Sequence, residues 1–398
     1  MISVAAARKI INDNAGPLAP VKVPLQLAAG LFLAEAIYAA TDIPSFNQSS
    51  VDGYAICYED WKEYGALKTS GEIPAGKAAA MELQPKQAIR IFTGAPVPAG
   101  ADTVVMQEKT SIDNGLLHIN DLQLQQGSNV RLKGSEIMMG ELALGSGSLL
   151  SPAAIGFLAG IGVEAVVVTK TPAITIIVTG NELQQPGKPL VHGQVYESNS
   201  YTLAAALQQQ HISSVNIVRV HDELDSLVTV LNRALDTSDM VLLTGGVSVG
   251  DYDFVPRAAT ACGVTQLFHR LRQKPGKPLY FGKKDERLVF GLPGNPSSVL
   301  TCFYEYVLPA LHLLNPAVSP LKNISVPLGS VIRKPAGLST FFKGIYDGHT
   351  VTLLGAQESF RLSSFAKANC LICMPEEATE CREGDIIEIH LLPESFNR

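Results

Sequence analysis

Three apolar, strand-like segments of this sequence each run into a glycine-containing turn. They are ITIIVTGNEL with Glu182, MVLLTGGVSVGDYD with Gly245, Gly246, Ser248 and Asp253, and LVFGLPGNPSS with Gly294, Asn295 and Pro296. In open parallel sheets such turns lie at the carboxyl ends of the strands, where ligands bind and free N–H groups attract anions. For each turn alone, the conformational freedom of glycine is the better explanation. The three together predict a site for a phosphate-bearing ligand.

The spacing of these turns excludes two common phosphate sites. GGVSVG lacks the G-x-G-x-x-G spacing of a dinucleotide fingerprint, and no Gly-Lys-Ser/Thr follows that would complete a P-loop. Carboxylates nevertheless accompany the turns, at Glu182, at Asp222 in VRVHDEL and at Asp253. A hard cation such as Mg²⁺ would relieve their repulsion of a phosphate. The alternative is that Glu182 and Asp222 only cap helices.

The string KPGKP places two lysines, Lys274 and Lys277, around a Pro-Gly turn and before Pro278. Two ammonium groups converging on one side form an oxyanion site, although such a string is also compatible with a solvated loop. Asp52 and Thr93 each stand beside a glycine turn, for which turn formation is a sufficient explanation. CLIC, from Cys370 to Cys373, matches C-x-x-C but has no second pair, which favours buried thiols. No histidine has the spacing of a metal ligand.

The strand candidates at 174–180, 215–220, 240–246 and 288–294 are separated by helix-length stretches, which predicts a parallel sheet covered on both faces over 169–315. Residues 316–398 have the texture of an all-β module. Residues 46–126 predict a β-rich domain that is inserted between two helical segments, 1–45 and 127–168. In the first of these segments, the apolar spacing predicts two helices, one near residues 4–11 and one near 25–37.

Composition sets the class of protein. The chain has 398 residues, of which 46% are hydrophobic and 17% are charged, and this excludes disorder and coiled coils. A net charge of -6 argues against nucleic-acid binding. No apolar run reaches the roughly 20 residues of a membrane span, and the N-terminus lacks the apolar core of a signal peptide. Six dispersed cysteines are typical of free thiols in a reducing compartment, which predicts a cytoplasmic protein.

Seven motifs occur in an order that resembles the molybdopterin molybdenumtransferase family, which includes the E domain of gephyrin. They are PSFNQSSVDGYA, IFTGAPVPAGADTVVMQE, RLKGSEI, IVTGNEL, TGGVSVGDYD, KPGKP and GLPGNPSS. The resemblance implies an α/β and β multidomain fold. Its parts are a molybdopterin-binding parallel-sheet domain, an inserted β-rich domain, a helical and elongated N-terminal domain, and a C-terminal β-barrel-like domain.

The resemblance also implies a reaction and an assembly. Molybdate is inserted into adenylylated molybdopterin with Mg²⁺ and with release of AMP. The subunits form a homodimer whose cleft lies between the α/β domain of one subunit and the inserted domain of the other. An upstream molybdopterin adenylyltransferase is the implied protein partner. Two other functions stay open: a molybdopterin-binding or adenylyl-transfer protein, which needs only 169–315, and a scaffold, which needs an additional interaction segment.

Carried over by position, the family motifs assign residues to three groups. Ser248, Asp222 and Asp253, with Glu182, sit at the adenylate and pterin phosphate, and the glycine turns with Gly245, Gly246, Gly294, Asn295 and Pro296 bind the pterin. Lys274, Lys277 and Pro278 hold molybdate, joined by Lys343 and Ser364, with Ser359 as a second candidate serine. Asp52, Thr93 and Glu136 reach in from the partner subunit.

Three positions depart from the family pattern. Asn47 replaces an aspartate, Ser135-Glu136 replaces Glu-Asp, and Lys343 replaces an arginine. The last change keeps the positive charge but removes a bidentate donor.

Overall fold

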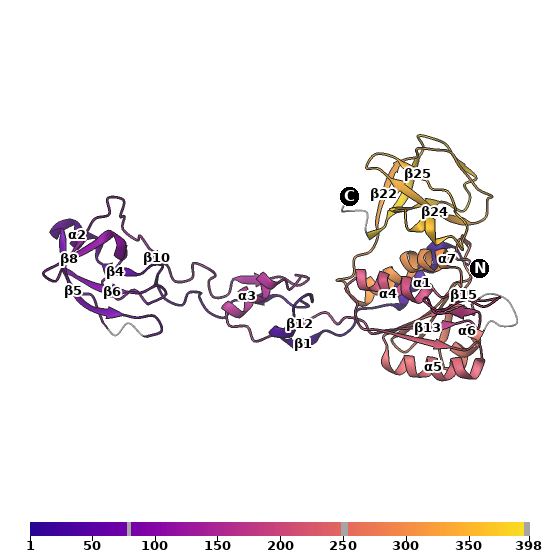
Figure 1. Cartoon of the computed structure of the whole chain (residues 1–398), viewed down its shortest axis with the longest axis horizontal. Coiled ribbons are helices and arrows are strands. Elements are labelled where there is room, and N and C mark those ends of the chain that lie inside the picture. The colour runs from indigo at the N-terminus through magenta and orange to yellow at the C-terminus, as the bar shows by residue number, and fades with distance from the viewer. Residues whose placement is uncertain (78–80, 248–253, 394–398) are drawn as a thin grey trace. The chain divides into compact units, whose positions relative to one another are not determined.

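The computed structural model describes residues 1–77, 81–247 and 254–393. They form two compact units (Figure 1). The α/β unit consists of Met1–Val21 and Thr169–Arg398, and the inserted unit consists of Lys22–Val168. Within the described ranges no helix is both long and apolar enough to cross a membrane.

A six-stranded sheet forms the centre of the α/β unit. Its order is β16 (Val215–Val220), β13 (Ile174–Thr179), β17 (Met240–Thr244), β21 (Arg287–Leu292), β20 (Tyr280–Lys284) and β18 (Thr265–His269). The first four strands are parallel, as the sequence predicts, and the last two run antiparallel to their neighbours.

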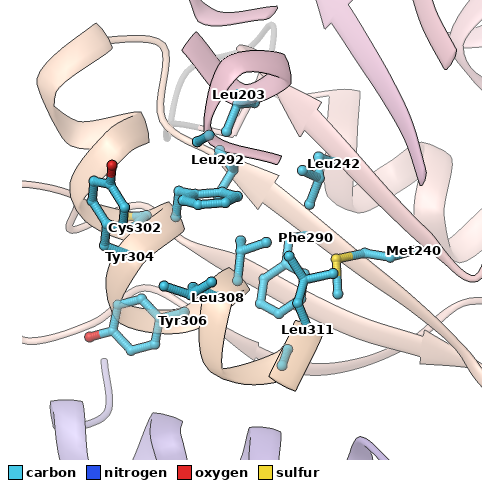
Figure 2. Packing of buried hydrophobic residues seen from close by; sticks show 14 of the residues in the cluster. Leu203, Met240, Leu242, Phe290, Leu292, Cys302, Tyr304, Tyr306, Leu308 and Leu311 are labelled. Atoms are coloured by element: carbon cyan, nitrogen blue, oxygen red, sulfur yellow. The ribbon is translucent and has the colours of Figure 1, made fainter. Parts of the chain in front are cut away.

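Both faces of this sheet are buried because alternate residues of each strand point into different cores. Met240 and Leu242 belong to one core, together with Phe290 (Figure 2). Val241 and Leu243 belong to the other core. Two helices cover the second face: α5 (Leu224–Thr237) and α6 (Phe254–Ala261). The first face is covered by α4 (Asn199–Gln209), α7 (Pro296–Cys302), a π-helical turn η3 (Phe303–Val307), α8 (Leu308–Leu314) and α1 (Val4–Asn14).

Helix α1 confirms the first of the two predicted N-terminal helices. The hydroxyl of Ser3 caps it by accepting a hydrogen bond from the Ala6 N–H over 3.2 Å. Its buried residues, Ala7 and Ile11, pack in the core of the α/β unit. The helix therefore packs with the part of the chain that begins at Thr169, although the whole inserted unit, Lys22–Val168, separates the two in sequence.

The prediction of a second helix near residues 25–37 is wrong. This stretch contains the 3₁₀ turn η1 (Leu25–Leu27) and the short strand β2 (Ile37–Tyr38). Gly30 adopts a φ of +79°, a conformation that ends a helix. The apolar residues whose spacing suggested a helix, including Leu25 and Leu33, instead pack from irregular chain into a core shared with α3 (Pro152–Gly160).

The inserted unit confirms the predicted β-rich domain. Its main sheet has the order β7 (Thr103–Met106), β4 (Gly53–Ile56), β6 (Gln87–Ile91), β5 (Ala66–Ile73), β9 (Leu116–Ile119) and β8 (Thr110–Asp113), with α2 (Tyr58–Tyr64) beside it. Three two-stranded ladders complete the unit: β1 (Val21–Pro24) with β12 (Ala165–Val168), β2 with β11 (Leu142–Leu144), and β3 (Gln48–Ser49) with β10 (Val130–Arg131).

A second sheet of the α/β unit is formed by the C-terminal part of the chain. Its order is β19 (Gln273–Lys274), β24 (Ser339–Tyr346), β26 (Cys370–Met374), β28 (Ile386–Leu391) and β22 (Lys322–Pro327), with β25 (Val351–Leu353) paired to β24. The ladder of β23 (Ile332–Arg333) with β27 (Glu380–Cys381) and the short helix α9 (Leu362–Phe365) lie outside this order. Strand β19 comes from the α/β segment, so the chain around Lys274 is held by the C-terminal sheet.

Candidate active site

A cavity of about 800 Å³ lies in the α/β unit beside the carboxyl ends of β13 and β21. It brings together residues from three of the predicted site motifs. They are Glu182, the loop residues Lys274, Lys277 and Pro278, and the turn residues Gly294, Asn295 and Pro296. Segments that lie more than 100 residues apart in the chain thus line one cavity at the sheet edge, where ligands of parallel sheets bind.

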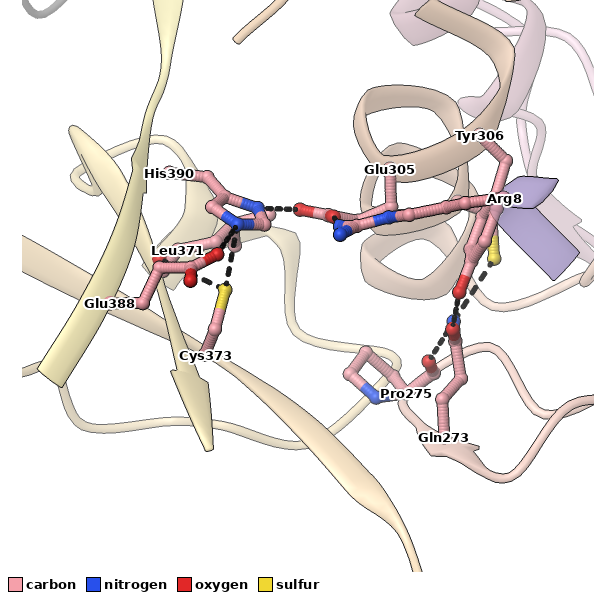
Figure 3. A network of polar contacts seen from close by, with 10 residues as sticks. Arg8, Gln273, Pro275, Glu305, Tyr306, Leu371, Cys373, Glu388 and His390 are labelled. Atoms are coloured by element: carbon pink, nitrogen blue, oxygen red, sulfur yellow. Dashed lines mark hydrogen bonds and ion pairs between the residues drawn. The ribbon is translucent and has the colours of Figure 1, made fainter. Parts of the chain in front are cut away.

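The two lysines of the cavity are exposed and stand on a buried base. Neither ammonium group forms a salt bridge with any residue that the structure describes. Beneath them, the fully buried Gln273 donates a hydrogen bond from Nε2 to the Pro275 carbonyl over 2.8 Å. The Gln273 amide oxygen in turn accepts a hydrogen bond from the Tyr306 hydroxyl (Figure 3). The loop is therefore fixed from below, and the two lysines that it carries are exposed and line the cavity, which suits a small dianion.

Gly276 must be a glycine for this loop to pack. Its φ is +86°, and a Cβ at this position would lie 2.5 Å from the sulfur of Cys302. Lys274 also pairs with Thr340 in parallel register, so strand β24 restrains the backbone at the start of the loop. The lysines are presented by backbone that is fixed at several points, so little ordering entropy is lost when an anion binds.

The turn after β21 forms another part of the cavity lining. Asn295 donates a hydrogen bond from Nδ2 to the hydroxyl oxygen of Ser359 over 2.9 Å, and Asn199 donates from Nδ2 to the Gly294 carbonyl over 2.9 Å. The Asn199 Oδ1 atom is buried without a hydrogen-bond partner in the described chain. Such an unpaired buried acceptor is unusual in a folded protein.

Sequence reasoning missed Glu197 and Asn199, which both line the cavity. Glu197 is buried and its carboxylate accepts hydrogen bonds from the N–H (2.8 Å) and the hydroxyl of Ser200, at the start of α4. The signal for these residues is the polar run ESNS that precedes an apolar helix. Such a run is typical of a helix start, and its place at a site depends on the fold.

The predicted metal-binding carboxylates Glu182 and Asp222 follow two neighbouring strands, β13 and β16, and only Glu182 lines the cavity. Glu182 is exposed and lines the cavity. Asp222 follows β16 and accepts a hydrogen bond from the Thr179 hydroxyl at the end of β13. Neither residue forms a salt bridge with the described residues, so both present oxygen ligands of the kind that Mg²⁺ prefers. Asp253 and Ser248 lie outside the described residues.

Gly245 and Gly246 follow β17, between the ends of β13 and β21, and do not line the cavity. Gly245 has a φ of +89°, and a Cβ there would lie 2.5 Å from the Thr179 carbonyl oxygen. The described contacts of this glycine therefore account for its presence through packing against β13.

Lys343 and Ser364 lie behind the cavity wall instead of lining it. The buried ammonium of Lys343 donates hydrogen bonds to the carbonyls of Ala356 (2.8 Å) and Arg361 (3.1 Å), and burial lowers its pKa. The Ser364 hydroxyl donates to the Gly355 carbonyl over 2.8 Å. Both side chains thus hold the 355–361 segment. This segment carries Ser359, the second candidate serine, to the cavity.

The predicted residues of the inserted unit form two separate groups. Asp52 accepts hydrogen bonds on Oδ1 from the N–H and the hydroxyl of Thr93, both over 2.8 Å. These two bonds, in that order, lower the pKa of the Asp52 carboxyl. Glu136 is exposed, and no hydrogen bond or ion pair in the described chain joins it to Asp52 or Thr93. Asn47, at one position that departs from the family pattern, caps the Lys133 N–H over 2.9 Å.

Comparisons with known proteins agree with this architecture along the chain. Three family models match: the MoeA N-terminal region (domain I and II) over 2–162, a probable molybdopterin binding domain over 175–313, and the MoeA C-terminal region (domain IV) over 325–392. A molybdopterin molybdenumtransferase of Haemophilus influenzae is 32% identical over 100% of this chain and 99% of that protein. One from a Nostoc species is 34% identical over 93% of this chain and 88% of that protein.

A solved structure confirms the fold class. The molybdopterin biosynthesis MoeA protein of Pyrococcus horikoshii has a TM-score of 0.80 and 27% identity over 98% of this chain and 99% of that chain. With relatives above 30% identity along nearly their whole length, the chain belongs to the molybdopterin molybdenumtransferase family.

Proposed function

We propose that this protein inserts molybdate into adenylylated molybdopterin and releases AMP in a Mg²⁺-dependent reaction. It is an enzyme of molybdenum cofactor biosynthesis, as its family membership shows. The observation that carries the proposed chemistry is the pair of exposed lysines, Lys274 and Lys277. They line a cavity at the carboxyl ends of parallel strands.

The cavity offers two subsites of different chemistry. Molybdate is a small dianion, and the ammonium groups of Lys274 and Lys277 supply the charge that it requires. The turn Gly294–Pro296 also lines the cavity, and its backbone and the Asn295 side chain offer polar groups that suit the edges of a pterin. Placing both substrates in one cavity converts a reaction between two solutes into one between held groups, which lowers its entropic barrier.

The carboxylates supply the metal subsite. Glu182 and Asp222, with Asp253, would hold Mg²⁺, since the first two present carboxylate oxygens that are free of salt bridges with the described chain. The bound cation would neutralise phosphate charge as the phosphoanhydride of the adenylylated pterin is cleaved. Among the protein groups, Thr179 orients the Asp222 carboxylate by donating its hydroxyl hydrogen.

The remaining assignments concern the assembly. We propose a homodimer in which Asp52 and Thr93 of one subunit complete the cavity of the other. Asp52 is suited to such a role because the hydrogen bonds from Thr93 keep it ionised and oriented. We place the reaction in the cytoplasm, downstream of a molybdopterin adenylyltransferase. Sedimentation at micromolar concentration tests the dimer, and a 42.4 kDa species alone would contradict it.

Reconstitution tests the reaction. The purified protein is incubated with adenylylated molybdopterin, molybdate and Mg²⁺, and both AMP and the molybdenum-loaded cofactor are measured. We expect AMP release that requires molybdate and Mg²⁺, with one AMP formed per cofactor loaded. Tight binding of the pterin without AMP or loaded cofactor would show a binding protein in place of an insertase.

A further inference from the structure

Three side chains with metal-binding atoms meet on one face of the C-terminal sheet, far along the chain from the cavity lysines. Cys373 lies on β26, and Glu388 and His390 lie on β28. Cys373 pairs directly with Glu388 in the antiparallel ladder, and His390 is two residues further on. Because side chains two residues apart share a face of a strand, all three point to the same side (Figure 3).

The donor atoms of these residues are close enough to share one cation. The Cys373 sulfur lies 3.3 Å from His390 Nε2, which lies 2.8 Å from Glu388 Oε1, and all three donor atoms lie within 4.8 Å of one another. Tetrahedral zinc with bonds of about 2.0 to 2.3 Å places its ligand atoms roughly 3.3 to 3.8 Å apart. The Glu388 side chain is 52% exposed and can make the small adjustment that this requires.

The imidazole is oriented for this role by groups behind it. His390 donates a hydrogen bond from Nδ1 to Glu305 Oε1 over 2.8 Å, and both side chains are buried. The other Glu305 oxygen is paired with the Arg8 guanidinium. A carboxylate on Nδ1 fixes the tautomer that leaves Nε2 free to bind a metal, which is the arrangement of carboxylate–histidine–zinc sites.

The cluster of Cys373, Glu388 and His390 lines a cavity that is separate from the one with the two lysines. A cavity of about 380 Å³ is lined by all three residues, by Cys381 and by Thr340. It shares no lining residue with the cavity that contains Lys274 and Lys277. A cation bound there would keep at least one position open to water or to a ligand, because the protein supplies three donors.

We propose that Cys373, Glu388 and His390 bind one zinc-class divalent cation, separate from the Mg²⁺ of the insertion reaction. A thiolate, an imidazole and a carboxylate select zinc or a similar borderline metal over Mg²⁺, which takes oxygen ligands. Sequence reasoning favoured a buried thiol for Cys373 and assigned no histidine to metal, because the three ligands do not follow a spaced motif. The β26–β28 register brings them together.

The competing explanation is a chain of ion pairs without metal. Both nitrogens of His390 face carboxylates, so an imidazolium could donate to Glu305 and Glu388 at once. This arrangement uses Glu388 and His390 but needs no sulfur. Dependence of metal binding on Cys373 therefore separates the two explanations.

Cobalt provides the test. The full chain is stripped of metal with a chelator, titrated with Co²⁺ as a spectroscopic substitute for zinc, and then titrated with Zn²⁺. We expect one Co²⁺ per chain, with a near-ultraviolet band from thiolate-to-cobalt charge transfer, and displacement by one equivalent of Zn²⁺ but not by millimolar Mg²⁺. Absence of the band, or of binding, would overturn the proposal.

Variants locate the ligands. Cys373→Ser should lose the charge-transfer band, and Cys381→Ser, whose thiol lines the same cavity, should keep it. Glu388→Gln, at an exposed position that tolerates change, should weaken Zn²⁺ binding at least tenfold. Glu305→Gln, which removes the orienting charge, should weaken it about 10- to 100-fold. A band that persists in folded Cys373→Ser would place the cation elsewhere, and if that variant does not fold, unaltered Zn²⁺ affinity in Glu388→Gln would refute the site.

Discussion

The hydroxyl of Tyr306 donates a hydrogen bond to the amide oxygen of Gln273, and both side chains are fully buried beneath the loop that carries Lys274 and Lys277. Gln273 passes this restraint on through its hydrogen bond to the Pro275 carbonyl. The backbone of the lysine loop is thus linked by hydrogen bonds to a buried tyrosine that does not line the cavity.

Tyr306→Phe tests this dependence. The substitution keeps the ring but leaves a buried amide oxygen unpaired, at a cost of about 1–3 kcal/mol. We expect a lower melting temperature together with a higher molybdate concentration for half-maximal insertion. Calorimetry and the AMP assay measure the two effects. Unchanged molybdate dependence in a destabilised variant would show that the tyrosine stabilises the fold without positioning the loop.

Lys274→Ala and Lys277→Ala test the oxyanion subsite directly. Each charge-assisted hydrogen bond to molybdate contributes about 1.5–3 kcal/mol, so each variant should raise the half-maximal molybdate concentration by roughly one to two decades. Affinity for the adenylylated pterin should change much less.

Lys283→Ala provides the matched control for these lysines. This lysine pairs with Glu286 and lies outside the cavity, so its loss should leave molybdate dependence unaltered. If the two cavity variants bind the pterin poorly and respond normally to molybdate, KPGKP belongs to the pterin subsite.

Lys343 distinguishes a residue that binds molybdate from one that supports the wall. Replacing this buried lysine by Ala removes its two hydrogen bonds to the carbonyls of Ala356 and Arg361, which should lower the melting temperature by an amount corresponding to about 1–3 kcal/mol. Lys343→Arg, although it matches the family pattern, must fit a larger group into the same buried space and should also destabilise, by about 1–3 kcal/mol. A variant with normal stability and weakened molybdate binding would instead support direct contact.

The hydrogen bonds from Thr93 to Asp52 predict a pH dependence. They lower the pKa of Asp52 in the folded protein, so the ionised carboxylate stabilises the fold at pH values above the ordinary aspartate pKa of about 3.9. This contribution is lost as the pH falls through the lowered value. The melting temperatures of the wild type and Asp52→Asn should therefore differ at neutral pH and converge in acid. Thr93→Val removes one of the two donors, so its melting temperature should differ from that of the wild type by less than that of Asp52→Asn does. A difference between the wild type and Asp52→Asn that widens in acid would contradict the assignment.

Local sequence patterns correctly predicted those elements whose burial can be inferred from their own residue types. Runs of β-branched residues such as Ile174–Thr179 gave buried parallel strands, because every position of a strand is buried in a sheet that is covered on both faces. The glycine turns could be found because they directly follow predicted strands, and the lysine loop could be found because two lysines flank a Pro-Gly pair. In the described cavity the turn after β21 and the lysine loop do lie together.

The residues that sequence reasoning misplaced are those whose environment depends on distant chain. Lys343 is a cation like any other in the sequence, and only the fold places two carbonyls against its ammonium group. Leu25 and Leu33 have a helical spacing that irregular chain satisfies equally well when a helix such as α3 covers it. Helix α1 gives no local sign that its partners lie in the α/β core.

The placement of helix α1 has a consequence for synthesis on the ribosome. Arg8 pairs with Glu305, 297 residues later, and the helix packs against α8. Helix α1 must therefore wait, with Ala7 and Ile11 uncovered, until its partners nearly 300 residues later have been translated, whereas the contiguous segment Lys22–Val168 is complete much earlier. At about 5–20 residues per second, this interval lasts roughly 15 to 60 seconds. During that time this nascent segment has no partner for its apolar residues, and we expect a chaperone that binds apolar segments to recognise it.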